Sequence, residues 1–142
     1  MSKTVLVAED EPHILESLTF LLKRAGYAVE SVRDGAAAVE AVVAGRPDLV
    51  ILDVMMPSLD GFEVLRRIRA TPGLGRLPVL ALTAKGQDAD RRRMLDLGAD
   101  EFVTKPFSNR ELVARIDALL STAGEDPDSG DPPPAAREGQ GP

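Results

Sequence analysis

Short apolar runs alternate with amphipathic stretches along most of the chain. Residues 5–7, 49–52 and 79–82 are apolar throughout, which is typical of strands that are buried on both faces. Weaker strands are expected at 29–32 and 102–103, nearer the edges of a sheet. Strands that alternate with helices in this way predict an α/β fold, a parallel sheet with helices on both faces.

The stretches between these strands carry apolar residues at helical spacing. Residues 14–22 and 112–120 both place Ile, Leu or Val one, four, seven and eight positions after a first apolar residue. This spacing predicts helices with one buried stripe. Gly26, Gly45 and Gly98 stand where helices are expected to end, because glycine readily adopts the left-handed conformation that closes a helix.

The end of the chain differs in composition from the rest. Residues 123–142 lack Val, Ile, Leu, Met and aromatic residues, and they hold five of the eleven prolines. Such a segment buries too little apolar surface to offset its conformational entropy. We therefore predict one folded domain over residues 1–122 and a disordered acidic tail over 123–142.

Charge and composition exclude several kinds of function. The net charge is −6, of which the tail contributes −4 through one basic and five acidic side chains. An acidic chain does not attract phosphate backbones, so direct nucleic-acid binding is disfavoured. There is no cysteine for a disulfide or a thiolate zinc site, and no apolar run approaches the ~18 residues of a membrane span. Because the start also does not resemble a signal peptide, a cytoplasmic protein without membrane contact is predicted.

The predicted strands end in residues that can carry chemistry. Parallel strands joined by right-handed crossovers bring their carboxyl ends to one edge of a sheet. In chain order, the residues at these ends are Glu9, Asp10, Asp53, Thr83 and Lys105. Clustered carboxylates repel one another unless a cation joins them, and all-oxygen ligands select Mg²⁺, or Mn²⁺ in its place. A metal, a lysine and a carboxylate that attacks phosphorus are the parts needed to move a phosphoryl group.

Each of these residues also has a purely structural explanation. Asp10 or Asp53 could cap the helix that follows it, and Lys105 could be a solvated surface lysine. Thr83 and Phe102 could be strand-end residues that pack against the last helix. Their gathering at one predicted edge favours the chemical interpretation.

Four motifs occur in a recognisable order: VLVAEDEP at 5–12, DLVILDVMMPSLDGFEVL at 48–65, PVLALTA at 78–84 and DEFVTKPF at 100–107. With these motifs at this spacing, the chain resembles the receiver domain of two-component response regulators over about residues 3–121. The resemblance implies a CheY-like, flavodoxin-like fold with a five-stranded parallel sheet in the order 2-1-3-4-5. It also implies a phosphorylation-dependent switch that signals by protein–protein contact.

The resemblance implies a role for the residues at the strand ends. Asp53 would accept a phosphoryl group from a sensor histidine kinase or a histidine phosphotransfer protein. Asp10, Asp53 and the backbone carbonyl of Met55 would bind Mg²⁺, and Glu9 would help through water. Lys105 would pair with a phosphoryl oxygen.

The resemblance further implies a switch. Thr83 would move its hydroxyl onto the phosphate, and Phe102 would fill the space that the hydroxyl leaves. The family more often has Asp at position 9 and often has Tyr at position 102. Because it lacks the hydroxyl of Tyr, Phe102 is expected to turn inward more often. A cis peptide between Lys105 and Pro106 is implied as well.

Other functions fit the sequence less well. A phosphatase with an aspartate nucleophile needs a second acid two residues later, where this chain has Met55. We therefore predict no enzyme activity beyond the chain's own phosphoryl transfer and autodephosphorylation. A nucleotide-binding module is disfavoured because the loop at 9–11 is acidic. An excised receiver of a longer regulator remains an alternative.

Partner binding is the least determined aspect. Solvated helix faces explain Arg66, Arg67, Arg69 and the arginine run at 91–93. Alternatively, a basic patch on the fourth helix binds an acidic partner or the chain's own tail. The downstream partner is not identified by the sequence, and a homodimer that forms on phosphorylation stays open.

Overall fold

The computed structural model of the protein describes residues 3–123, in which strands and helices alternate from first to last. The strands are β1 (Thr4–Ala8), β2 (Ala28–Val32), β3 (Leu49–Asp53), β4 (Val79–Ala84) and β5 (Glu101–Lys105). The helices are α1 (Pro12–Arg24), α2 (Gly35–Gly45), α3 (Gly61–Ala70), α4 (Asp88–Leu97) and α5 (Asn109–Ala123).

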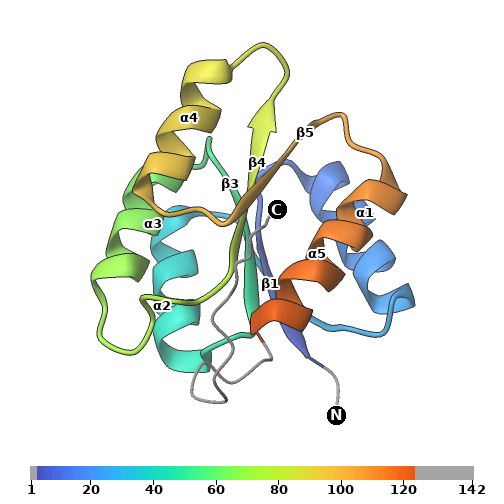
Figure 1. Ribbon diagram of the computed structural model, residues 1–142, viewed down its shortest axis with the longest axis horizontal. Coiled ribbons are helices and arrows are strands. Elements are labelled where there is room, and N and C mark those ends of the chain that lie inside the picture. The colour runs from blue at the N-terminus through green and yellow to red at the C-terminus, as the bar shows by residue number, and fades with distance from the viewer. Residues whose placement is uncertain (1–2, 124–142) are drawn as a thin grey trace.

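The strands form one parallel sheet in the order β2-β1-β3-β4-β5, which confirms the predicted fold (Figure 1). Every residue of the central strand β3 is buried, whereas β2 lies at an edge and is largely exposed. The weaker strands expected at 29–32 and 102–103 fall within β2 and β5. All five strands therefore end at the same edge, the upper side of the sheet in Figure 1.

Two apolar cores hold the helices against the sheet. Helices α2, α3 and α4 cover one face, and α1 and α5 cover the other (Figure 1). Because neighbouring residues of a strand point to opposite faces, Leu6 and Leu52 belong to the first core and Val7 and Ile51 to the second. Each fully buried aliphatic side chain contributes roughly 1.5–3 kcal/mol. The two cores thus hold the strand ends, and the residues on them, in fixed positions.

Carboxylates begin the first three helices. Glu11, Asp34 and Asp60 each accept a hydrogen bond from a backbone N–H in the first turn of α1, α2 and α3. The structural explanation that Asp10 or Asp53 caps a helix is therefore wrong. Both carboxylates are left for other roles.

Glycine closes two of the helices as expected, but not the third. Gly98 ends α4 with a φ of 112°, and Gly26 follows α1 with a φ of 100°. Helix α2 does end at Gly45, as predicted, but the residue that closes it in the left-handed conformation is Arg46, with a φ of 44°. A cation therefore stands at the closing position where a glycine is usual.

Helix α5 ends the described part of the chain. Ser108 precedes it and accepts a hydrogen bond from the N–H of Glu111 at 3.2 Å. The helix runs to Ala123, so the acidic tail predicted over 123–142 lies outside the described residues from 124 onward. Across residues 3–123, no helix is both long and apolar enough to cross a bilayer.

Candidate functional site

The ends of β1, β3 and β5 bring three charged side chains together. Asp53 ends β3, Lys105 ends β5, and Glu9 directly follows β1. The Nζ of Lys105 lies 3.0 Å from Oε1 of Glu9 and 3.2 Å from Oδ1 of Asp53. Glu9 is 1% exposed and Asp53 is 6% exposed. Two buried carboxylates thus share one lysine, and the cluster carries one net negative charge when all three groups are ionised.

Burial and repulsion act on the acid at the centre of this cluster. Burial raises the pKa of Asp53 to about 6, and the negative charge of Glu9 adds to the rise, while Lys105 opposes it. Burial alone would lower the pKa of Lys105, but the charges of Asp53 and Glu9 outweigh it and raise that pKa. The lysine therefore stays protonated, and the cluster gains from any further positive charge.

One oxygen of Glu9 has no hydrogen-bond donor. Its Oε2 accepts a hydrogen bond from the N–H of Glu11 at 2.9 Å. Its Oε1 is buried and faces Lys105 as an ion pair, but it accepts no hydrogen bond within the part of the chain that the structure describes. Lys105 is the cation that this oxygen faces in the described residues, and the oxygen retains capacity to accept from a water that a bound cation would hold.

Asp10 and Met55, the other two predicted metal ligands, both have exposed side chains. Asp10 is exposed, and its backbone carbonyl faces the guanidinium of Arg33 at 3.5 Å. Among residues 3–123, no three acidic or histidine side chains form a group that could hold a metal by themselves, so a metal site here would also need backbone or water oxygens. The side chain of Met55 is 71% exposed. Direct binding by Asp10 and by the Met55 carbonyl stays a prediction.

The two expected switch residues lie on neighbouring strands. Thr83 is 2% exposed, and its Oγ1 lies 3.5 Å from Oγ1 of Thr104 on β5. The ring of Phe102 is half-buried against the core under α4. The peptide between Lys105 and Pro106 is cis, as the resemblance implies.

A cleft of about 410 Å³ opens beside the cluster. Its lining residues come from β3, the loop after it, the end of β4, the start of α4 and the end of β5: Asp53, Val54, Met55, Ala84, Gln87, Asp90 and Lys105. Sequence reasoning missed Gln87 and Asp90. The signal that could have found them is the short connection at this edge between Ala84, the last residue of β4, and Asp88, the first of α4.

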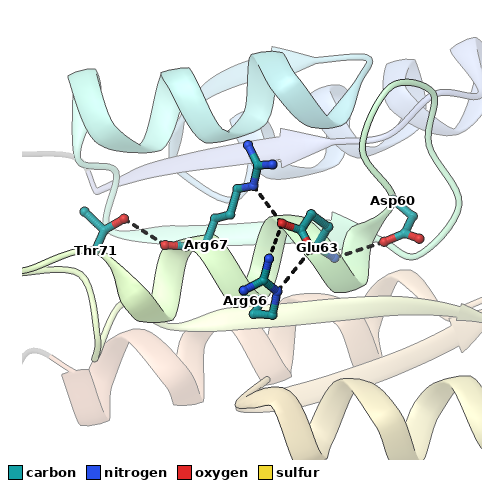
Figure 2. A network of polar contacts seen from close by, with 5 residues as sticks. All are labelled: Asp60, Glu63, Arg66, Arg67 and Thr71. Atoms are coloured by element: carbon teal, nitrogen blue, oxygen red, sulfur yellow. Dashed lines mark hydrogen bonds and ion pairs between the residues drawn. The ribbon is translucent and has the colours of Figure 1, made fainter.

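The arginines of α3 are engaged within the domain. Arg66 and Arg67 both pair with Glu63, whose N–H donates to Asp60 (Figure 2). Arg69 donates hydrogen bonds to backbone carbonyls of the loops before β4 and β5. The side chains of these three arginines are held by contacts within the domain, so they do not form a free basic surface.

Two of the three arginines in the run at 91–93 cover aromatic rings. The guanidinium carbon of Arg91 lies 4.9 Å from the ring centre of Phe102, and that of Arg93 lies 4.0 Å from the ring centre of Phe62. Such cation–π contacts are favourable and hold a side chain in place. The basic patch considered on α4 is therefore partly committed to contacts within the domain.

Known proteins match most of this chain. The family model described as the response regulator receiver domain matches residues 5–117, which include all three residues of the charged cluster. The alkaline phosphatase synthesis transcriptional regulatory protein PhoP of Bacillus subtilis (strain 168) is 44% identical over 120 residues, which are 84% of this chain and 49% of that protein. The chain spans about half the length of the curated relatives it matches.

Solved structures share the whole fold. The signal receiver domain of a signal transduction histidine kinase from Syntrophus aciditrophicus is 38% identical with a TM-score of 0.82, over 88% of this chain and 95% of that one. The receiver domain of a sensor histidine kinase from Pseudomonas aeruginosa PAO1 is 32% identical with a TM-score of 0.80, over 85% of this chain and 99% of that one. That second structure has a magnesium ion coordinated in its active site cleft.

Proposed function

Because this chain belongs to the family of response regulator receiver domains, we propose that it is a signalling switch in which Asp53 accepts a phosphoryl group. The observation that carries this proposal is the position of Lys105, whose Nζ lies 3.2 Å from Oδ1 of Asp53. Both side chains also line the same cleft of about 410 Å³. A nucleophilic carboxylate and a cation for the incoming phosphate thus face one accessible space.

The proposed transfer forms one bond and breaks one. A carboxylate oxygen of Asp53 attacks the phosphorus of a phosphohistidine on the kinase or on a histidine phosphotransfer protein. The phosphorus–nitrogen bond breaks, and the imidazole leaves with the electron pair and takes up a proton. Lys105 neutralises charge on the phosphoryl oxygens. With a pKa of about 6, Asp53 is mostly ionised at neutral pH and can act as the nucleophile.

The residues at this edge fit a magnesium ion. All candidate donors are oxygens, and the buried Oε1 of Glu9 accepts no hydrogen bond from any residue of the described range. Asp10, Asp53 and the carbonyl of Met55 would hold the ion, with Glu9 acting through water, and Mn²⁺ would substitute. When bound, the ion supplies positive charge for the phosphoryl oxygens. The magnesium in the Pseudomonas aeruginosa relative supports this assignment.

The proposed response to phosphate uses Thr83 and Phe102. The Thr83 hydroxyl, which now lies near that of Thr104, would turn to the phosphoryl group, and Phe102 would move inward. The guanidinium of Arg91 lies over the Phe102 ring and would lose that contact. The resulting change in surface would be read by a downstream protein, as a monomer or a phosphorylation-dependent homodimer.

The same proposal covers what the chain does not do. Met55 stands where an aspartate-nucleophile phosphatase needs an acid, so turnover of phosphate esters is not expected. Its chemistry would be limited to receiving the phosphoryl group and losing it to water. A cytoplasmic location, without direct contact to nucleic acid or membrane, remains the prediction made from the sequence.

Acetyl phosphate tests the proposal without the kinase. With Mg²⁺, the chain should gain a single phosphoryl group by intact mass, and the gain should be labile at high pH and abolished by a chelator. Asp53→Asn should not gain it. Asp96→Asn, which changes an exposed aspartate of α4, should gain it normally. Repeated release of phosphate from ester substrates would identify a phosphatase and overturn the proposal.

A second possibility within the same function is that this chain is the receiver part of a longer response regulator. The observation that favours it is that the chain spans about half the length of the curated relatives it matches. An antibody raised against this domain would separate the two forms in cell extracts. A band at 15.2 kDa supports a regulator of this length alone, and a heavier band supports the longer form.

A further inference from the structure

We propose that a cationic cleft at the amino edge of the sheet binds the chain's own acidic segment 125–131. This cleft, of about 330 Å³, lies at the opposite edge from Asp53. It is lined by residues at the start of β1, the end of α2, the loop after α3 and the last turns of α5. The proposal does not depend on phosphorylation, because none of its residues belongs to the phosphate site.

Three cations surround the cleft. Lys3 precedes β1, Arg46 follows α2, and Arg76 lies in the loop between α3 and β4. All three are exposed, and none is within ion-pair distance of a carboxylate in the range 3–123. The only acid in the lining is Asp48, whose Oδ2 accepts a hydrogen bond from the N–H of Thr4 at 2.7 Å. The cleft therefore has a local excess of two positive charges.

This excess distinguishes the cleft from the arginines of α3 and α5 that pair with carboxylates. Arg66 and Arg67 are paired with Glu63, and Arg115 is paired with Glu101 and Glu111. Each of those cations has a carboxylate partner that the folded domain itself provides, although Arg66 and Arg67 share one. The cations of the cleft have no such partners in the described residues, so they are available to a segment of opposite charge.

Arg46 places its charge over the cleft at some conformational cost. It closes α2 with a φ of 44°, a conformation that glycine adopts more easily. Its Nη1 lies 3.0 Å from the point where a Cβ on Gly73 would stand, so the side chain crosses from α2 to the loop after α3. A cation here also interacts favourably with the carboxyl end of α2. Its guanidinium is the third positive charge at the cleft, with those of Lys3 and Arg76.

The acidic segment follows α5 closely in the sequence. Leu120 of α5 lines the cleft, and α5 ends at Ala123. Segment 125–131, with the sequence EDPDSGD, holds four acidic side chains and no basic one. Because it is tethered a few residues from the cleft, its effective concentration there is in the millimolar range (~1 mM or more), and weak charge contacts are enough. Binding would keep the chain beyond α5 at the edge opposite Asp53.

A spin label on the full chain tests this docking. The chain has no cysteine, so Ser129→Cys gives a single labelling site. If the segment binds the cleft, the amide NMR signals of Arg46, Arg76 and Leu77 should fall to about half or less of those around Asp53, because binding holds the label at the cleft for more of the time than tethering alone does. In about 1 M salt, where the Debye length is ~3 Å, the difference should disappear.

A neutral variant of the segment provides a control whose changes all lie outside residues 3–123. It carries Glu125→Gln, Asp126→Asn, Asp128→Asn and Asp131→Asn in the labelled chain. It should lose the signal reduction at the cleft. Glu138→Gln, which changes an acid outside the segment, should keep it. A reduction that persists in the neutral variant would overturn the proposal.

Cation variants then locate the binding surface. Arg46→Gln with Arg76→Gln should abolish the reduction, whereas Arg92→Gln with Arg110→Gln, which removes the same charge from α4 and α5, should leave it unchanged. A reduction centred on α4, or one spread evenly over the surface, would show that the cleft does not bind the segment.

Discussion

At the carboxyl edge of the sheet, the buried carboxylates of Asp53 and Glu9 share one lysine, whereas at the amino edge three exposed cations surround Asp48. Charge at the first edge is shielded from solvent and salt, so its energy depends on the position of a single ammonium group. Charge at the second edge is solvated, and each contact there contributes little. The first edge suits chemistry at fixed atoms, and the second suits weak, salt-sensitive binding.

The largest effect is expected from removing the shared lysine. Lys105→Met leaves two buried carboxylates without a cation, which costs about 3–5 kcal/mol for a fully buried pair. Because 24% of the Lys105 side chain is exposed and one acid can take up a proton, we expect about 2–3 kcal/mol here. Urea unfolding at pH 7 without metal measures this loss. A change no larger than that of Lys23→Met, on the exposed side of α1, would contradict the account.

A smaller effect on the free energy of unfolding is expected from the raised pKa of Asp53. Its value of about 6 in the folded chain lies above the ordinary 3.8, so the folded state binds this proton more tightly than the unfolded state does. The resulting stabilisation is complete below about pH 4 and is lost as the pH rises through about 6, and it amounts to about 1–3 kcal/mol.

Asp53→Asn cannot take up this proton. Its free energy of unfolding, measured relative to the original chain without metal, should therefore increase between about pH 4 and about pH 7. Asp96→Asn should show no such trend. A difference between Asp53→Asn and the original chain that is constant across this range would show that Asp53 titrates as an ordinary exposed acid.

The smallest effect on stability is expected at the amino edge. Arg76→Gln removes one exposed cation, so the free energy of unfolding should change by no more than about 0.5 kcal/mol. The same urea experiment measures it, at low salt and at high salt. A loss as large as that of Lys105→Met would mean that the two edges do not differ in the way described.

The fold was predictable because buried parallel strands need unbroken apolar runs. The run at 49–52 ends at Asp53 and the run at 79–82 ends at Thr83, so their positions at one edge followed from the pattern without any side-chain geometry. Lys105 followed in the same way from the weaker strand before it. The pattern of apolar residues therefore predicted the strands and the edge at which they end correctly.

The choice between the two adjacent acids was not predictable. Glu9 and Asp10 lie side by side in sequence, but Glu9 is buried and Asp10 is exposed. The N–H of Glu9 still donates to the carbonyl of Val32 at 3.1 Å, which continues the ladder of β1 by one residue. Successive side chains of a strand point to opposite sides of the sheet. Which of the two acids is buried therefore depends on the exact residue at which the strand ends.

Gln87 and Asp90, which line the cleft, were also missed. Gln87 precedes α4 and Asp90 lies in its first turn, but no side-chain cap marks where this helix starts. Arg46 was missed for a related reason, because Gly45 next to it is the residue that normally closes a helix. The exact start or end of a helix is set by contacts with the rest of the fold where the local sequence gives no clear signal.

Beryllofluoride, which mimics a phosphoryl group, tests the central claim that Asp53 and Lys105 form the phosphate site. Amide NMR spectra of the full chain with Mg²⁺ would be recorded before and after its addition. The account predicts large shifts at Thr83 and Lys105 in the original chain and none in Asp53→Asn. Unchanged spectra in the original chain, or equal shifts in the variant, would contradict it.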